Sequence, residues 1–353
     1  MTSRQIAGIR LHSQQIAGTG VSDPAALVRR MGCLQAQDFA GAKWALATRL
    51  PGIGETDIDR AFQEGAILRT HVLRPTWHFV SPHDIRWMLR LSAPKIRALS
   101  QGLHRKLGID AVALRRSKTA LGNALAGGKR LTRAQLLAPL RKARVNTDDI
   151  RMGFYLMDAE VEGLICSGGR EGKQFTYSLL DDRAPFSDPV DARSAVVELA
   201  TRYFHSRGPA TVYDFAWWSG LTISRAQGGL EAIRHTLTHT VVRGQAYWFP
   251  RDCMAFSRPS VRLLPAYDEY TVAYRDRADV LAPEAGETTG NGIFRPILVV
   301  NGQVTGVWKR TETRAAITLE VSPLQPLGPG ATRLLAAEVQ SFGRYAGKPA
   351  TLV

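Results

Sequence analysis

The sequence predicts an α+β fold of three winged-helix units in series, followed by a β-rich C-terminal subdomain. Three observations carry this prediction: helix starts marked by capping residues, β-ribbons that turn at glycine, and an Asn-Gly hairpin near the end. The order helix, helix, β-ribbon, which is typical of a winged helix, occurs three times. A length of 353 residues is enough for two or three globular units of roughly 100–200 residues each.

The first unit is expected within residues 1–125. Residues 56–59 (Thr-Asp-Ile-Asp) predict a helix start, because a capping Thr and a nearby acid satisfy the first free N–H groups. Ser81 and Pro82 predict a second start, with Ser81 as N-cap and Pro82 in the first turn. The other expected elements are a helix at 25–31, β-runs at 67–73 and 76–80, and a basic helical extension.

The second unit is expected within residues 126–185. Thr132 and Gln135 form a capping-box pattern, which predicts a helix that runs to Lys142. A second helix is expected at 151–164, because its apolar residues recur on one face. Two short strands around a Gly-rich tip are expected at 164–177.

The third unit, residues 186–255, repeats this order. Residues 209–214 are expected to cap an aromatic-rich helix, and residues 222–233 form a second helix. The ribbon at 239–249 is expected to turn at Gly244.

The C-terminal part, residues 256–353, changes character. Segments 261–275 and 292–310 are rich in β-formers, and Asn301-Gly302 predicts a type I′ hairpin turn. A polar loop is expected at 276–290 and a closing helix at 333–345. We expect a small barrel or sheet that buttresses the wings.

Basic residues are concentrated in one segment. The net charge is +15, and residues 86–146 carry fifteen Lys or Arg but a single acid, Asp110. Solvated helix faces normally mix acids with bases, so this composition favours a polyanionic partner.

Several function classes are disfavoured by what the sequence lacks. It contains no P-loop, dinucleotide-binding, H-E-x-x-H, G-x-S-x-G or zinc-deaminase pattern. Cys33, Cys166 and Cys253 match no metal-ligand or disulfide spacing. No apolar stretch approaches the roughly 20 residues of a membrane span, and residues 1–10 lack a signal-peptide core. We expect a soluble intracellular protein.

A polar cluster near the N-terminus is the first candidate site. Residues 34–38 (Leu-Gln-Ala-Gln-Asp) follow an apolar helix and precede Lys43 and Trp44. Residues two apart do not share a helix face, so Gln35 and Gln37 can converge on one site only where the chain is extended or turning. The alternative is an ordinary helix C-terminus with solvated glutamines.

A second cluster lies at residues 70–79. In a strand, Thr76 and His78 point to one face and the intervening aromatic residues to the other, so His78 could face a groove. Single buried histidines are more often structural than catalytic, and the residues alone do not decide. Residues 50–54 (Leu-Pro-Gly-Ile-Gly) match a DNA-binding hairpin, but no clean helix precedes them, and we expect a loop.

Four blocks of this sequence resemble the AlkZ-like winged-helix DNA glycosylases, which remove alkylated purines and unhook interstrand crosslinks. Residues 34–38 match the family's Gln-apolar-Gln catalytic motif. Gln37 indicates the Gln-Gln branch, whose founding member protects a producer of the crosslinking agent azinomycin, rather than a branch with Asp there. The other blocks are 69–78, 263–270 and 291–296, so the resemblance covers most of the chain.

The resemblance implies tandem winged helices around a concave DNA-binding face, with Gln35 and Gln37 as catalytic residues. Alkylation at N7 makes a purine cationic, so it leaves as a neutral base and needs little protonation. The barrier then lies in an oxocarbenium-like sugar and the arrival of water. Two amides can orient that water, although neutral Gln is a poor base. Lys43, the nearest lysine, is assigned to phosphate, so we expect a monofunctional enzyme.

The resemblance also implies a cytoplasmic, nucleoid-associated monomer without metal or cofactor. We expect it to act on double-stranded DNA carrying alkylated purines, with no membrane or metal partner. The alternative is a non-enzymatic winged-helix regulator, which should bind one operator sequence at least ~10³-fold better than other DNA. The expected DNA contacts are Lys43, Trp44, His71, Arg74, His78, Arg170, Lys173 and Arg243. For the ribbon-tip residues Arg170, Lys173 and Arg243, the alternative is that they are ordinary solvated turn residues.

Overall fold

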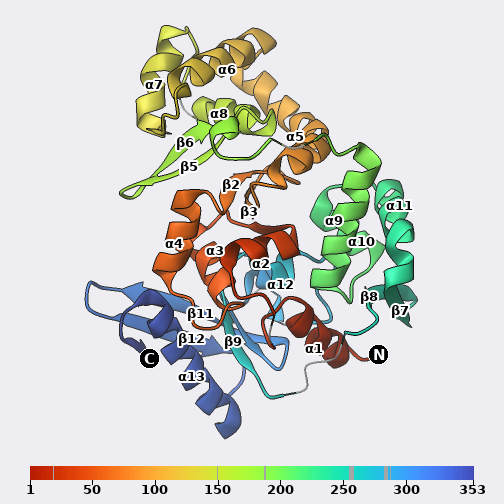
Figure 1. The fold of residues 1–353 in the computed structure, drawn as a ribbon. Helices are drawn as coiled ribbons and strands as arrows, with labels where there is room; N and C mark the ends of the chain where they lie inside the picture. Colours follow the sequence, from red (N-terminus) through yellow and green to blue (C-terminus); the bar gives the residue numbers. More distant parts are fainter. Residues whose placement is uncertain (19, 149, 187, 254–257, 282–284, 287) are drawn as a thin grey trace. The chain divides into compact units, whose positions relative to one another are not determined.

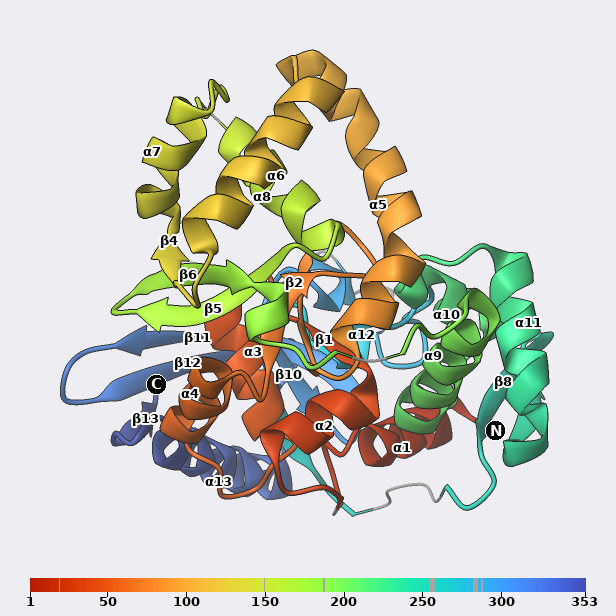
Figure 2. The same ribbon diagram turned by 45° about the horizontal axis from the view of Figure 1, so that its top comes forward.

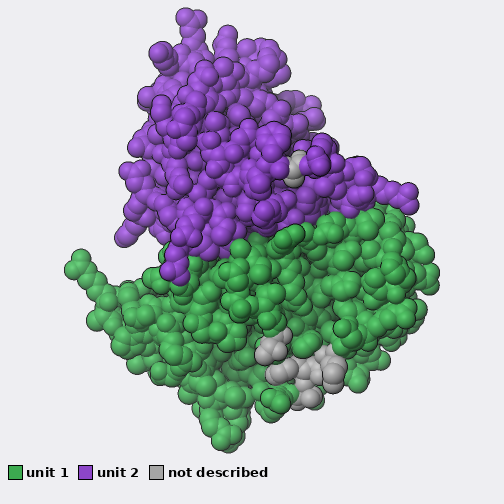
Figure 3. All heavy atoms as spheres, in the orientation of Figure 1, with its two compact units in different colours: residues 1–59, 196–353 green, residues 60–195 purple. Residues whose placement is uncertain are grey.

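The computed structural model describes residues 1–353 apart from 19, 149, 187, 254–257, 282–284 and 287. Contacts divide the chain into two compact units, which Figure 3 shows in different colours: unit 1 comprises residues 1–59 and 196–353, and unit 2 comprises residues 60–195. The boundary at residue 59 falls within α4 (Glu55–Glu64). The division into four segments that we expected stays a prediction.

Unit 1 begins with short elements that capping residues define. Asp23 accepts a hydrogen bond from the N–H of Ala26 and caps α2 (Pro24–Met31), which is the helix expected at 25–31. After β1 (Cys33–Gln35) comes α3 (Phe39–Ala47). Helix α1 (Ser3–Ser13) was not predicted, because most of its residues are buried and no amphipathic period marks it.

The expected helix, helix and ribbon of residues 186–255 are present. After α9 (Ala192–Arg207), Thr211 and Asp214 form a capping box at the start of α10 (Val212–Ser219). Thr222 caps α11 (Ile223–Ile233). Strands β7 (Leu237–Val242) and β8 (Gln245–Pro250) pair antiparallel, and Gly244 at their turn has a φ of 74°.

The C-terminal part of unit 1 is a five-stranded sheet in the order β13-β12-β11-β10-β9. Asn301 and Gly302 have φ of 51° and 82° between β10 and β11, so the expected hairpin turn is confirmed. The strand expected at 261–275 ends at Leu264, because Asp268 caps a short helix. The elements are β9 (Val261–Leu264), α12 (Glu269–Val272), β10 (Ile297–Val300), β11 (Gln303–Glu312), β12 (Ile317–Pro323), α13 (Pro329–Ala346) and β13 (Ala350–Leu352).

Helix α13 contacts β9 and β13, and Figure 1 shows it beside this sheet. Trp308 and Phe342 pack edge to face there, with ring centroids 5.7 Å apart. The helix is longer at both ends than the segment 333–345 that we expected. The expected polar loop at 276–290 includes positions 282–284 and 287, which lie outside the described residues.

Unit 2 starts with α4 and the antiparallel strands β2 (Leu68–His71) and β3 (Trp77–Val80). Helix α4 begins one residue earlier than expected. Ser81 caps a turn as expected, since its Oγ accepts the N–H of His83 at 3.2 Å, but the regular helix starts later than predicted. The Ser81 carbonyl accepts the N–H groups of Asp84 and Ile85 at 3.0 and 3.1 Å, and this turn delays the helix. Helix α5 therefore runs from Ile85 to Leu107.

The rest of unit 2 contains the second expected order of helix, helix and ribbon. Gly108 ends α5, and α6 (Ala111–Leu125) follows. Figure 2 shows α5 and α6 as two long helices that meet at one end. Thr132 and Gln135 form the predicted capping box. The ribbon turns at Gly172, and the other elements are β4 (Leu131–Thr132), α7 (Arg133–Lys142), α8 (Arg151–Val161), β5 (Ile165–Glu171) and β6 (Gln174–Leu179).

A separate apolar core of unit 2 lies among α6, α7, α8 and β5, and includes Leu121, Leu136 and Tyr155.

No helix in the part of the chain that the structure describes is long and apolar enough to cross a membrane.

Candidate active site

The glutamine motif (residues 34–38) lies where β1 ends and α3 begins. Gln35 is the last residue of β1 and is half-buried, whereas Gln37 lies exposed in the following bend. Asp38 caps α3, since its side chain accepts the N–H of Gly41 at 3.1 Å. The alternative of a helix C-terminus is therefore wrong, because α2 ends at Met31. The chain is extended and then turning, as convergence of the two glutamines requires.

A buried carboxylate holds the backbone of this motif. The N–H of Gln35 donates to Oε1 of Glu269 at 2.9 Å. Oε2 of the same carboxylate accepts Nε of Arg207 and Nε1 of Trp218, each at 2.9 Å. All of these groups belong to unit 1, although more than 230 residues separate Gln35 from Glu269 along the chain.

Arg207 also binds the backbone just before the motif. Its two terminal nitrogens donate to the carbonyl oxygens of Met31 and Cys33, each at 2.7 Å. The guanidinium thus contacts both the end of α2 and the start of β1 while it pairs with Glu269. Both side chains are at most 1% exposed. Loss of one member of such a buried pair typically costs about 3–5 kcal/mol, because it leaves the other charge uncompensated.

The side chain of Gln35 has an unused acceptor. Its Oε1 is buried and accepts no hydrogen bond from the described residues. A buried acceptor without a donor typically costs about 1–3 kcal/mol, and such atoms in native structures often accept a bond from water or a ligand. The acceptor capacity of the Gln35 amide oxygen is therefore unused within the described part of the chain.

An aromatic pair lies close in the chain to Glu269. Tyr267 has a φ of 62°, a conformation that is uncommon for a bulky residue, and its N–H donates to the carbonyl of Ile293 at 2.7 Å. Its ring packs edge to face with Phe294, whose side chain remains 63% exposed. Sequence reasoning identified both segments but neither residue. An exposed aromatic next to a turn is the signal that could have found them.

Two expected DNA contacts are core residues instead. Nζ of Lys43 is buried and pairs with Glu55 at 2.7 Å and with Asp59 at 2.8 Å. Trp44 is buried, donates from Nε1 to a backbone carbonyl, and lies against Phe342 with ring centroids 4.6 Å apart. Carboxylates and the core already occupy these groups, so we assign neither side chain to DNA.

The expected contacts of the 70–79 cluster lie in unit 2. His71 is buried, with Nδ1 hydrogen-bonded to Glu160 and its ring 4.4 Å from that of Trp77. His78 is fully buried, and its Nδ1 lies 2.9 Å from the carbonyl of Thr76. Arg74 is half-buried in the connection between β2 and β3. The structural interpretation of His78 therefore fits better than a contact with a groove.

The ribbon tips carry the remaining expected contacts. Lys173 is exposed at the turn of β5 and β6, and Arg170 is half-buried with its guanidinium 5.7 Å from the ring of Phe175. Arg243, at the tip of β7 and β8, is half-exposed and pairs with Asp279 at 2.5 Å. A hydrogen bond with Tyr247 and the charge of Asp279 raise the pKa of Arg243.

The basic segment (residues 86–146) forms α5, α6 and α7 of unit 2. Arg86, Arg97 and Lys118 pair with carboxylates of the same unit. The remaining twelve side chains are exposed and have no carboxylate partner among the described residues: Arg90, Lys95, Arg105, Lys106, Arg115, Arg116, Lys129, Arg130, Arg133, Arg141, Lys142 and Arg144.

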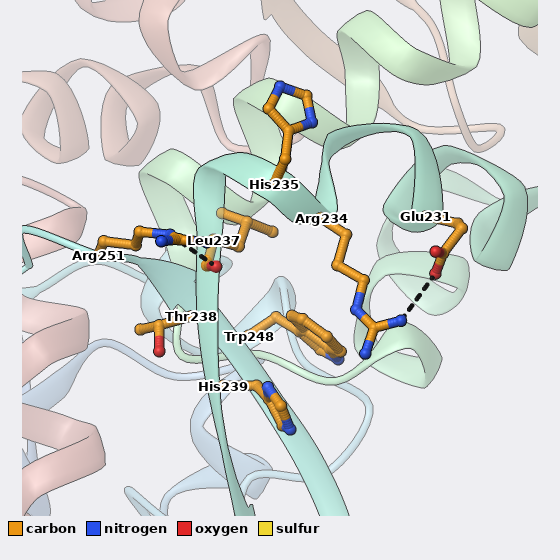
Figure 4. Close-up of a pocket in the computed structure, with 8 residues that line it drawn as sticks. All are labelled: Glu231, Arg234, His235, Leu237, Thr238, His239, Trp248 and Arg251. Carbon is orange, nitrogen blue, oxygen red and sulfur yellow. Dashed lines mark hydrogen bonds and ion pairs between the residues drawn. The ribbon is translucent and has the colours of Figure 1, made fainter.

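A pocket at the base of the β7–β8 ribbon was missed by sequence reasoning (Figure 4). His239 stacks on Trp248 with ring centroids 4.5 Å apart. The guanidinium of Arg234 lies 5.4 Å from the Trp248 ring and pairs with Glu231 at 3.6 Å. Arg251 donates to a backbone carbonyl of β7. Stacking and cationic groups together are typical of nucleic-acid surfaces.

No group of three or more His, Cys, Asp or Glu that could hold a metal ion occurs among the residues described. The three cysteines are free thiols, and burial raises the pKa of the Cys166 thiol to about 12. A thiol with so high a pKa is not a nucleophile near neutral pH.

Comparison with known proteins agrees with the resemblance. A sequence profile described as "DNA glycosylase AlkZ-like" matches residues 28–345. The "Interstrand DNA cross-link repair glycosylase" of Streptomyces sahachiroi is 24% identical over 339 residues, which are 89% of this chain and 90% of that protein. The solved structure of Streptomyces sahachiroi DNA glycosylase AlkZ shares the fold, with a TM-score of 0.82, 22% identity and full coverage of both chains. Because the profile spans most of the sequence, this chain belongs to the AlkZ-like DNA glycosylase family and is a glycosylase enzyme.

Proposed function

We propose that this glycosylase hydrolyses the N-glycosidic bond of N7-alkylated purines in double-stranded DNA and leaves an abasic site. The glutamine motif carries the proposal: no described residue donates to the buried amide oxygen of Gln35, and Gln37 follows it in an exposed bend. Bulky adducts and interstrand crosslinks are among the proposed lesions, because a relative over most of the chain is named for crosslink repair. A role in DNA repair, or in self-resistance to alkylating natural products, belongs to the same proposal.

The chemistry needs orientation more than acid or base strength. An N7-alkylated purine departs as a neutral base, so the enzyme must stabilise an oxocarbenium-like sugar and deliver water. Oε1 of Gln35 accepts a hydrogen bond from that water, and the amide of Gln37 orients the water or the sugar. Correct placement of reacting groups contributes several kcal/mol to catalysis, and a shift of about 1 Å can cost about 10²-fold in rate.

The surroundings of the motif supply this placement. Glu269 fixes the N–H of Gln35, and Arg207 fixes the carbonyls on either side of the turn that leads into β1. Tyr267 and Phe294 offer an exposed aromatic surface on which a base extruded from the duplex can stack. These residues position the substrate and the motif, and we propose no direct chemical role for them.

DNA is held by the charged surfaces. In this proposal the three orders of helix, helix and ribbon are winged helices, and the enzyme acts as a monomer. The basic segment contacts phosphates, together with Lys173 and Arg170 on one ribbon and Arg243 on another. Phosphate contacts give affinity that depends strongly on salt but little on sequence. A non-enzymatic regulator is not proposed, because the chain belongs to a family of enzymes.

The test is release of 7-methylguanine from methylated duplex DNA, followed by the same assay on a crosslinked duplex. Gln35→Ala and Gln37→Ala should each lower single-turnover excision by at least ~10²-fold while duplex affinity changes less than about threefold. Gln227→Ala, an exposed glutamine on α11, is the matched control and should excise like the native chain. Full activity in the double glutamine variant would refute the proposal.

A further inference from the structure

Unit 2 contains an apolar pocket that the proposed reaction does not use. Its volume is about 560 Å³, within the range that small-molecule sites occupy. Helices α5 and α8 form two of its sides, through Leu99, Leu103 and Phe154. The turn between β2 and β3 closes it with Pro75 and Trp77.

The mouth of the pocket exposes aliphatic side chains. Leu99 is 59% exposed, Leu103 38% and Ile150 54%. Single exposed aliphatic residues are common, but here all three line one concavity. Occupation of the pocket by an apolar ligand would remove this surface from water, and burial of each such side chain is favourable.

The inner end of the pocket has a defined polar group. His71 lines it and binds the buried carboxylate of Glu160 through Nδ1. That contact leaves Nε2 as the remaining polar atom of the ring, as an acceptor in the neutral form and a donor in the protonated form. Trp77 and Phe154 add aromatic side chains to the lining. The Trp77 ring already contacts the His71 ring, with centroids 4.4 Å apart, and the Arg69 guanidinium at 4.3 Å, so Phe154 offers the freer aromatic surface.

The rim favours negative charge. Arg133 lines the pocket, is exposed, and has no carboxylate partner among the described residues. None of the described lining residues is acidic. The first turn of α8 also contributes to the lining, but the N–H groups of Arg151 and Gly153 already donate to the carbonyls of Asp148 and Ile150. The positive charge at the rim is therefore that of Arg133.

We propose that this pocket binds a small aromatic anion, with its apolar part against Leu99, Leu103 and Phe154 and its anionic group toward Arg133. The volume admits a molecule of this size, and the apolar lining and the rim charge point to this class. The site would lie outside the glutamine motif and belongs to the other unit, so it does not depend on the proposed reaction.

The probe is 8-anilinonaphthalene-1-sulfonate, an aromatic sulfonate of suitable size, titrated into the full chain by fluorescence. We expect saturable binding of one molecule per chain. Leu99→Glu places a negative charge at the mouth and should weaken binding by at least ~10-fold. Val112→Glu, an exposed aliphatic of the same unit outside the pocket, is the control and should change binding less than about twofold.

A second pair of variants tests whether the charge of Arg133 contributes to binding. Arg133→Gln should weaken the sulfonate by about 3- to 10-fold but leave the uncharged analogue N-phenyl-1-naphthylamine unchanged. Arg141→Gln, on the same helix outside the pocket, should affect neither probe. Equal binding by Leu99→Glu and Val112→Glu, or equal effects of the two arginine variants, would overturn the assignment. Thermal melts show whether each variant is folded, and the arginine pair remains informative if Leu99→Glu is not.

Discussion

The glutamine motif and the basic segment differ in where they place charged side chains. The motif is uncharged, and a buried ion pair of Arg207 and Glu269 holds its backbone through hydrogen bonds of 2.7–2.9 Å. The basic segment exposes twelve Lys and Arg side chains that have no carboxylate partner among the described residues, on α5, α6, α7 and the segments that follow α6 and α7. Charge is thus buried where a geometry must be fixed, and exposed where a long polyanion must be held.

This contrast has a physical basis. A buried carboxylate and guanidinium lose their hydration and stay in place only with fully satisfied partners, so they fix their neighbours in one arrangement. Exposed cations keep their hydration and their rotamer freedom, which suits contacts with phosphates that differ along a duplex. Substitutions in the two regions should therefore fail in different ways.

The largest effect is expected for Glu269→Gln. The neutral amide leaves the buried Arg207 without a counter-charge and loosens the hold on Gln35. Thermal or denaturant unfolding should show a loss of about 3–5 kcal/mol. At a temperature where the variant is folded, single-turnover excision should fall by about 10²-fold while duplex affinity stays within about threefold.

Two further variants distinguish the loss of correct placement of Gln35 from a loss of stability of the whole fold. Glu338→Gln removes another buried carboxylate that accepts a backbone N–H, that of Leu263, but does not touch the motif. It should lose stability without a comparable loss of excision rate. The double variant Glu269→Gln with Arg207→Met should regain stability but not rate, since no guanidinium then holds the carbonyls of Met31 and Cys33. Recovery of rate in that double variant would contradict the positioning role.

A smaller effect is expected when charge is removed from the basic segment. Replacement of Arg115, Arg116 and Lys142 by Gln should weaken duplex binding by about 10- to 100-fold at low salt. It should also reduce the slope of log affinity against log salt by about 2 to 3. Excision at saturating enzyme should be unchanged. Fluorescence anisotropy between 50 and 200 mM salt measures the slope, and an unchanged slope would remove this segment from the DNA-binding surface.

A change of about tenfold is expected for Phe294→Ala, because base–aromatic stacking contributes about 1–3 kcal/mol. Excision of 7-methylguanine should fall while the melting temperature changes little, since the side chain is mostly exposed. Phe294→Tyr keeps the ring and serves as the control. Equal rates for the alanine variant and the native chain would exclude a stacking role.

The smallest effect is expected for Arg97→Gln. Arg97 pairs with Glu162 on a partly exposed surface, and such pairs contribute about 0–1 kcal/mol. A shift in unfolding free energy of less than about 1 kcal/mol should be accompanied by near-native excision. A loss of unfolding free energy as large as that of Glu269→Gln would show that burial does not explain the difference between the two regions.

Local signals predicted many elements because the physics of their termini is local. Thr132, Thr211 and Thr222 cap helices within three residues of their own position, and Asn301-Gly302 fixes a hairpin by its φ preferences. The same rules failed for α1, whose buried residues surround the helix, and at Ser81, where a turn delays the start. Those elements are decided by what packs around them.

The site was predictable only in part for the same reason. The residues of the glutamine motif are adjacent in sequence, and its non-helical backbone was the condition we set for convergence. Lys43 and Trp44 looked like surface residues beside it, yet carboxylates at 55 and 59 and the ring of Phe342 bury them. No local sequence pattern identifies partners that come from other segments of the chain.

The sequence by itself determined the family, the order of helices and ribbons, the location of the basic surplus and the identity of the glutamine motif. Each of these follows from neighbouring residues or from composition. Only the tertiary structure decided that Glu269 and Arg207 hold this motif and that an apolar pocket opens beside His71. Both depend on segments far apart in sequence, which folding brings within hydrogen-bonding or van der Waals distance.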